Sequence, residues 1–119
     1  MSRRILLVDD DSSVLAIAAR TLTGYDVSIA HSGGEALAAA RSGPFDLVIT
    51  DYMMPAMTGD ELLGRLRETQ PDLKALILTG HADILSDENP GWWRTEPHLG
   101  KPFTIDALRR AVAAIVGAV

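Results

Sequence analysis

The chain has 119 residues, a formal net charge of −5 and no cysteine. This length fits one domain over residues 1–119, and a hydrophobic share of 47% is sufficient for one packed core. Direct nucleic-acid binding is disfavoured because it needs a basic face, and a chain without cysteine forms no disulfides or thiolate metal sites. No apolar run approaches the roughly 20 residues of a membrane helix, so we expect a soluble, cytoplasmic protein without membrane contacts. Composition leaves the oligomeric state open.

Short apolar runs along the chain indicate buried β-strands. They occupy residues 5–8, 27–30, 47–50 and 75–79. Apart from Ser28 and the final Thr50 and Thr79, these runs are continuously apolar rather than alternating, which is typical of strands covered on both faces. The runs therefore predict a parallel sheet with helices on both sides.

Longer segments with helical spacing of apolar residues separate these strands. The first is expected to begin at an N-cap of Ser12 or Ser13. The second contains residues 36–40, the third residues 58–70 and the last residues 104–116. The apolar residues expected on the buried side of the last helix are Ile105, Leu108, Val112, Ile115 and Val116.

This alternation of strands and helices predicts an α/β fold of the flavodoxin-like, doubly wound type. The expected five-stranded parallel sheet has the order 2-1-3-4-5, which is the usual arrangement for such folds. The segment between Thr79 and Lys101 departs from the pattern because it contains two prolines and little helical periodicity. It predicts a shortened or irregular fourth helix of one or two turns, and a very short last strand at residues 98–100.

Acidic side chains follow two of the predicted strands. Asp9, Asp10 and Asp11 come directly after the first strand, and Asp51 follows the third. If these strands are neighbours, their carboxylates meet at one edge of the sheet, where they repel one another unless a cation is present. Oxygen ligands of this kind suit Mg²⁺, with Mn²⁺ as an alternative. A second interpretation of residues 9–11, taken alone, is that they only cap the first helix.

Two further polar side chains are expected at the same edge. Thr79 ends the fourth strand, and Lys101 precedes Pro102 after the fifth. Each taken alone is typical of a turn or a solvated surface. Together with the carboxylates they form a set suited to phosphoryl transfer, with a nucleophilic aspartate, a metal and lysine to neutralise phosphoryl oxygens, and a hydroxyl donor.

With these residues, the chain resembles the response-regulator receiver family over essentially its whole length. The motifs that carry the resemblance are residues 5–11 (ILLVDDD), 46–55 (DLVITDYMMP), 58–59 (TG), 78–80 (LTG) and 101–103 (KPF). The resemblance implies the following roles: Asp51 as phospho-acceptor, Asp10 as metal ligand, Asp9 as a ligand directly or through water, the Met53 carbonyl as a further ligand, Thr79 as switch hydroxyl and Lys101 as phosphate-pairing lysine. It also implies a cis bond before Pro102.

The chain departs from the family pattern at two places, in its last predicted strand and in the segment that precedes this strand. His98 stands where the family usually has a tyrosine or phenylalanine that switches with phosphorylation, so it is either a switch ring or a loop histidine without a role. The stunted fourth helix is similar to that of receivers attached to hybrid sensor kinases. Of the adjacent Trp92 and Trp93, we expect one to fill the core and the other to be a candidate anchor for a partner.

Two positions are candidates for setting the lifetime of a phosphoryl group on Asp51. In the family, the side chains two residues after the acceptor and two after the switch threonine flank the path of attacking water. Here these are Met53 and His81. An apolar Met53 should order water poorly, so we expect slow self-dephosphorylation.

The resemblance implies a signalling switch that is phosphorylated by a histidine kinase or histidine phosphotransfer protein. It is not expected to be an enzyme acting on other substrates. An aspartyl-phosphate phosphatase of the haloacid-dehalogenase type is the first competing hypothesis, but it needs an acid two residues after the nucleophile, where Met53 stands. The second is a degenerate receiver that acts only as an interaction surface. The third is a flavin-binding module, which the acidic first loop disfavours.

Overall fold

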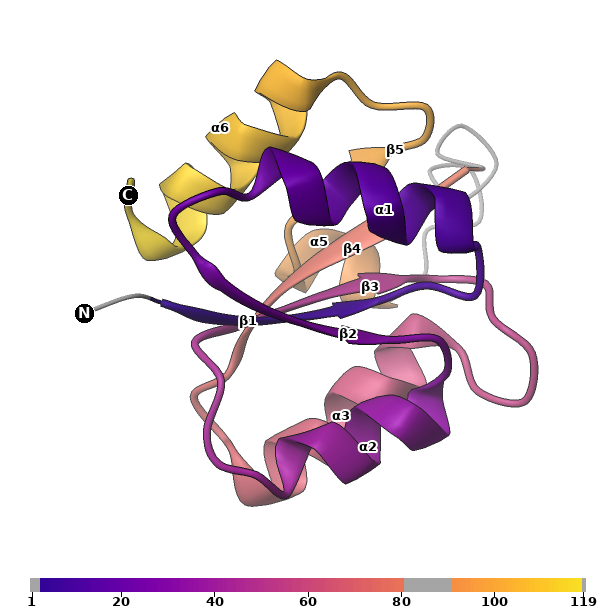
Figure 1. Cartoon of the computed structure of the whole chain (residues 1–119). Helices are drawn as coiled ribbons and strands as arrows, with labels where there is room; N and C mark the ends of the chain where they lie inside the picture. The colour runs from indigo at the N-terminus through magenta and orange to yellow at the C-terminus, as the bar shows by residue number, and fades with distance from the viewer. Residues whose placement is uncertain (1–2, 81–90, 119) are drawn as a thin grey trace.

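The computed structural model describes residues 3–80 and 91–118. Five parallel strands form one sheet with the order β2-β1-β3-β4-β5, as predicted (Figure 1). The strands are β1 Arg4–Val8, β2 Asp26–Ala30, β3 Leu47–Asp51, β4 Lys74–Thr79 and β5 His98–Gly100.

Helices cover both faces of the sheet (Figure 1). Helices α1 (Ser12–Thr21) and α6 (Ile105–Val116) lie on one side, and α2 (Gly33–Ala40) and α3 (Gly59–Thr69) on the other. The five-residue helix α5, Gly91–Thr95, precedes β5. It matches the one or two turns expected between β4 and β5, and the rest of that segment, residues 81–90, lies outside the described residues.

The strands divide their side chains between two cores. In β1, Ile5 and Leu7 pack with α1 and α6, whereas Leu6 and Val8 pack with α2 and α3. All four side chains are fully buried, which explains why the strand sequences are continuously apolar. Burial on both faces fixes the register, because a slip of one residue would exchange the two faces.

The register aligns the carboxyl ends of the central strands. Val8 of β1 lies opposite Thr50 of β3, and Asp51 lies opposite Leu78 of β4. Thr79 in turn lies opposite Gly100 of β5. The residues that follow these positions therefore emerge along one edge of the sheet.

Two local predictions were wrong. The N-cap of α1 is Asp11, whose side chain accepts a hydrogen bond from the Ser13 backbone N–H, and Ser12 is already the first helical residue. Ile105 is 59% exposed rather than buried. As the first residue of α6 it lines a groove with Ile17 of α1, outside the core filled by Leu108, Val112 and Val116.

In the part of the chain that is described, no helix is long and apolar enough to cross a membrane.

Candidate functional site

Three carboxylates meet at the carboxyl edge of the sheet. Asp9 and Asp10 follow β1, and Asp51 is the last residue of β3. One oxygen from each lies within 4.8 Å of the others. Asp9 and Asp51 are buried and Asp10 is exposed, so the group is open to solvent on one side. The backbone N–H of Asp11 donates to Oδ1 of Asp9 at 2.9 Å and orients that carboxylate.

Lys101 brings a positive charge into this group from the end of β5. Its Nζ lies 2.7 Å from Oδ2 of Asp9 and 3.3 Å from Oδ1 of Asp51. Its backbone N–H donates to the Thr79 carbonyl at 2.7 Å, which ties the residue to β4. Burial opposes the ammonium charge, but the hydrogen bond and charge of Asp9, together with Asp51, outweigh it and raise the pKa of Lys101. The peptide bond from Lys101 to Pro102 is cis, as expected.

The acidic charge at the site is only partly balanced. Burial, followed by the charges of Asp9 and Asp10, raises the pKa of Asp51 to about 6, and Lys101 opposes this rise. Three carboxylates facing one ammonium leave an excess of negative charge that a divalent cation would neutralise. The donors are all oxygens, with no histidine or thiolate in the described group, which fits Mg²⁺ better than a transition metal.

Three other predicted site residues, Thr79, Met53 and His81, are not members of the carboxylate group. Thr79 is buried at the end of β4, at the edge where the carboxylates gather. Met53 follows two residues after Asp51, and its side chain is 57% exposed. His81 lies outside the described residues. The structure thus brings Asp9, Asp10, Asp51 and Lys101 into direct proximity.

His98 is the first residue of β5 and lies opposite Ile77 of β4, whereas Thr79 lies opposite Gly100. Its ring is stacked on Trp93 with centroids 3.7 Å apart and an interplanar angle of 26°. Trp92 meets His98 edge-on at 6.0 Å and is itself 8% exposed. The structure therefore buries one tryptophan, as expected, and gives the half-buried Trp93 a ring partner within the chain.

Gly59 has a role at this site that the sequence motif alone did not explain. A Cβ at Gly59 would lie 2.4 Å from the Asp51 carbonyl oxygen, closer than any packing tolerates. The Gly59 N–H donates to the Tyr52 carbonyl at 2.8 Å, so the first turn of α3 rests directly on the end of β3. Glycine at the start of a predicted helix was the available signal, since a close approach of two backbones is a common reason for it.

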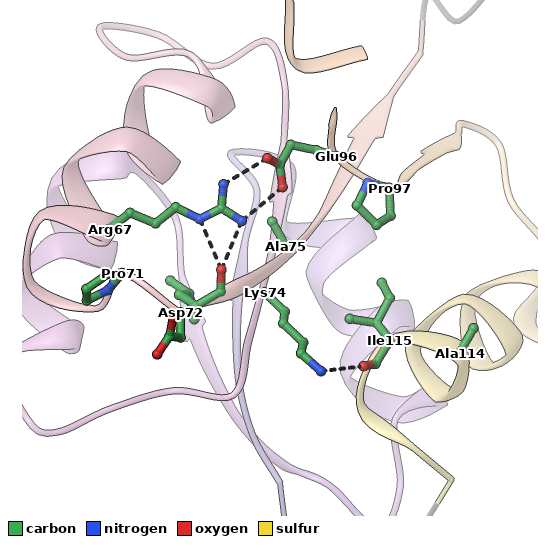
Figure 2. A pocket seen from close by; sticks show the side chains of 10 residues that line it. Arg67, Pro71, Asp72, Lys74, Ala75, Glu96, Pro97, Ala114 and Ile115 are labelled. Atoms are coloured by element: carbon green, nitrogen blue, oxygen red, sulfur yellow. Dashed lines mark hydrogen bonds and ion pairs between the residues drawn. The ribbon is translucent and has the colours of Figure 1, made fainter. Parts of the chain in front are cut away.

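A separate hollow of about 450 Å³ lies among residues of α3, β4 and α6, with Arg67 and Glu96 among its lining residues. Three of its four charged side chains are bonded: Arg67 pairs with Glu96, and Lys74 donates to the Ile115 carbonyl (Figure 2). Lys74 is the first residue of β4, so the hollow lies toward the edge of the sheet opposite the carboxylates. Its described lining residues offer no convergent unpaired charges for a ligand.

Comparison with known proteins shows the family to which the chain belongs. The sequence profile of the response regulator receiver domain matches residues 5–113. The chain belongs to the response regulator receiver family. The receiver fold of solved relatives is also the fold seen here. A CheY-like receiver domain protein from Methanospirillum hungatei superimposes with a TM-score of 0.84 at 31% identity, over 96% of this chain and 93% of that one. The chemotaxis response regulator CheY4 of Vibrio cholerae gives 0.86 at 31% identity, over 97% and 99%.

Longer relatives contain a region that matches nearly the whole of this chain. Response regulator MprA of Mycobacterium bovis is 39% identical over 119 residues, which is 98% of this chain and 51% of the relative. MprA of Mycobacterium avium is 38% identical over 116 residues, 95% of this chain and 50% of the relative. This receiver therefore spans about half the length of the curated relatives it matches.

Proposed function

We propose that this receiver domain accepts a phosphoryl group on Asp51 in a two-component phosphorelay. The observation that carries the proposal is the arrangement of Lys101 between Asp9 and Asp51, with Asp10 completing the acidic group. Under this proposal Asp9, Asp10 and Asp51 hold Mg²⁺, or Mn²⁺ in its place, and the Met53 carbonyl completes the ligand set. The bound ion would neutralise phosphoryl oxygens and orient them toward Asp51.

The chain's own residues have distinct parts in the transfer. A carboxylate oxygen of Asp51 forms a bond to phosphorus as the N–P bond of the donor phosphohistidine breaks. The electron pair of that bond stays on the imidazole nitrogen, which takes up a proton. Lys101 pairs with a phosphoryl oxygen, and the Thr79 hydroxyl donates a hydrogen bond to another. Because the pKa of Asp51 is raised to about 6, its carboxylate is ionised and nucleophilic above that pH.

The proposed partners are a histidine kinase or a histidine phosphotransfer protein in the cytoplasm. The domain is a switch that assists its own phosphorylation and dephosphorylation, and its output is a changed protein-interaction surface. Residues 1–119 are proposed to act as one domain. The exposed, apolar Met53 is proposed to slow hydrolysis of the acyl phosphate because it orders attacking water poorly, and His81 is the second candidate for this effect.

The phosphatase hypothesis lacks support in the site. Such an enzyme needs a general acid two residues after its nucleophile, and Met53 has no titratable group. A degenerate receiver would instead leave Asp51 unreactive. The following experiment separates a degenerate receiver from a receiver that is phosphorylated at Asp51.

Intact-mass measurement after incubation with phosphoramidate, whose N–P bond resembles that of phosphohistidine, tests the proposal. The expected result is a gain of one phosphoryl group that requires Mg²⁺, disappears in EDTA and is lost in Asp51→Asn. Asp46→Asn is the matched control, because Asp46 lies at the opposite end of β3 and accepts from the Arg4 N–H. No gain, or the same gain in Asp51→Asn, would refute the proposal.

A further inference from the structure

The strand that delivers Lys101 is weakly held by its own pairing. β5 has three residues, all half-exposed, and among the described strands it pairs only with β4 at the edge of the sheet. Short edge strands open readily because few hydrogen bonds retain them. Lys101 follows β5 directly, yet its Nζ must stay within 2.7 Å of Asp9 and 3.3 Å of Asp51. Other contacts must therefore hold this strand.

One such contact is a stack of rings at the start of β5. The His98 ring lies 3.7 Å from the Trp93 ring, and Trp92 packs against both. Trp92 also lies 5.0 Å from the ring of Tyr52, the residue after Asp51, and packs on Ile77 of β4. The stack joins the beginning of β5 to α5, and through Trp92 to the central strands.

The second contact is an ion pair just before β5. Arg67 of α3 donates from two nitrogens to the two carboxylate oxygens of Glu96, at 2.8 and 2.9 Å (Figure 2). The same guanidinium donates twice to the Leu73 carbonyl, at 3.0 and 2.9 Å, which fixes its plane. The Glu96 side chain is 12% exposed and that of Arg67 is 31% exposed, so the pair is partly shielded from solvent.

The two contacts surround the turn that leads into β5. Glu96 also ends α5 by donating its N–H to the Trp92 carbonyl at 2.8 Å. Pro97 then accepts from the Ile77 N–H at 3.0 Å, and His98 begins the strand. The path from α3 to the start of β5 is thus fixed at each step.

We propose that the Arg67–Glu96 pair and the Trp93–His98 stack form a clamp that positions Lys101 against the acidic site. The inference rests on the proposed function in one respect, the role of Lys101 as phosphate-pairing residue. None of the four clamp residues is placed in contact with the carboxylates, so they are positioning residues that act through β5. The clamp holds β5, and with it Lys101, in a position that the pairing of a three-residue strand cannot maintain alone.

Amide hydrogen exchange tests the clamp without reference to phosphorylation. The N–H of Lys101 donates to the Thr79 carbonyl and that of Ile77 to the Pro97 carbonyl, so both amides report on the contact between β4 and the β5 segment. The N–H of Tyr52 donates to the Leu78 carbonyl and reports on the contact between β3 and β4. Trp93→Ala and Arg67→Gln should each speed exchange at Lys101 and Ile77 by roughly two- to tenfold, the range for losing one aromatic pair or partly shielded ion pair. Exchange at Tyr52 should not change. Trp93→Phe, which keeps a stacking ring, should restore slow exchange, and Arg65→Gln, at an exposed arginine of the same helix, should have no effect.

A double-mutant cycle tests whether the clamp acts through Lys101. Calorimetric Mg²⁺ affinity is measured for the natural protein, Trp93→Ala, Lys101→Ala and the double variant. A less firmly held ammonium competes less with the metal, so the Trp93→Ala variant should bind Mg²⁺ more tightly than the natural protein. In the Lys101→Ala background, the same substitution should leave the Mg²⁺ affinity unchanged.

Unchanged exchange at Lys101 and Ile77, or equal acceleration at Tyr52, would overturn the clamp. An equal change of Mg²⁺ affinity in both backgrounds, or none in either, would overturn its action through Lys101. Failure of the natural protein to take up a phosphoryl group would instead refute the proposed function, and the exchange result would still decide the clamp.

Discussion

Lys101 bonds more closely to Asp9 than to Asp51. Its Nζ lies 2.7 Å from Oδ2 of Asp9, which is fully buried, and 3.3 Å from Oδ1 of Asp51. The ammonium thus occupies part of the space that a divalent cation would take at the carboxylates. It also neutralises part of the negative charge that would attract that cation. Under the proposed function, the metal and the lysine would compete for Asp9, and phosphoryl transfer would need the lysine at Asp51.

This competition predicts opposite effects of Lys101→Ala on two measurements. Mg²⁺ should bind more tightly, because a positive charge beside the ligands is removed. Phosphorylation by phosphoramidate should slow by about a hundredfold, the usual cost of losing one charged stabiliser of the transition state. Calorimetry and intact-mass time courses measure the two. Lys74→Ala, at the amino-terminal end of β4, is the control and should change neither. Weaker Mg²⁺ binding in Lys101→Ala would contradict the competition.

Removing the charge at position 51 should stabilise the metal-free protein. The pKa of Asp51 is raised from its ordinary 3.8 to about 6, a difference whose ceiling is near 3 kcal/mol and which solvent screening reduces to about 1–2 kcal/mol. Asp51→Asn in EDTA at pH 7.5 should therefore raise the free energy of unfolding by about that amount. Urea denaturation measures it. A loss of stability would mean that the Lys101–Asp51 ion pair outweighs burial and repulsion.

The same raised pKa predicts how stability depends on pH. In the folded state Asp51 binds a proton more readily than in the unfolded chain, so without metal its contribution to stability falls as pH rises from about 4 to about 6. Unfolding measured across this range should show that fall as a difference from Asp51→Asn. If the two curves run parallel, the carboxyl has no raised pKa.

Protons should also compete with Mg²⁺. With the pKa of Asp51 at about 6, roughly a quarter of the molecules are ionised there at pH 5.5, so Mg²⁺ affinity should be about fourfold weaker than at pH 7.5. Calorimetry at both pH values checks this, with buffers of matched ionic strength. Equal affinities would exclude Asp51 as a ligand that must ionise before binding.

Gly59 and Gly64 make a matched pair on α3. Gly59→Ala places a Cβ 2.4 Å from the Asp51 carbonyl oxygen and should lower the free energy of unfolding by about 1–3 kcal/mol. A Cβ at Gly64 meets nothing within 4 Å, so Gly64→Ala should raise stability by about 0.5–1 kcal/mol. Urea denaturation of both variants measures the contrast. Equal effects would show that the α3–β3 approach relaxes freely.

Sequence reasoning succeeded where the signal was periodic and local. The continuous apolar strands indicated burial on both faces, and parallel pairing then placed Asp9, Asp10, Asp51, Thr79 and Lys101 at one edge. This follows because the carboxyl ends of parallel strands share an edge of the sheet.

The remaining features depend on contacts through space. Periodicity could not show that Ile105, in the first turn of α6, lies outside the core. Ser12 and Asp11 are both good N-caps, so sequence alone did not separate them. Likewise the stack of His98 on Trp93 joins a helix to a strand and became apparent only from the fold.

Phosphorylation at Asp51 is tested most directly by locating the phosphoryl group with peptide mass spectrometry after borohydride reduction. Borohydride converts an aspartyl phosphate to homoserine. After incubation with phosphoramidate and Mg²⁺, we expect homoserine at position 51 alone, and none when EDTA is present. Homoserine at Asp9, Asp10 or any other aspartate, or no conversion at position 51, would contradict the proposed function.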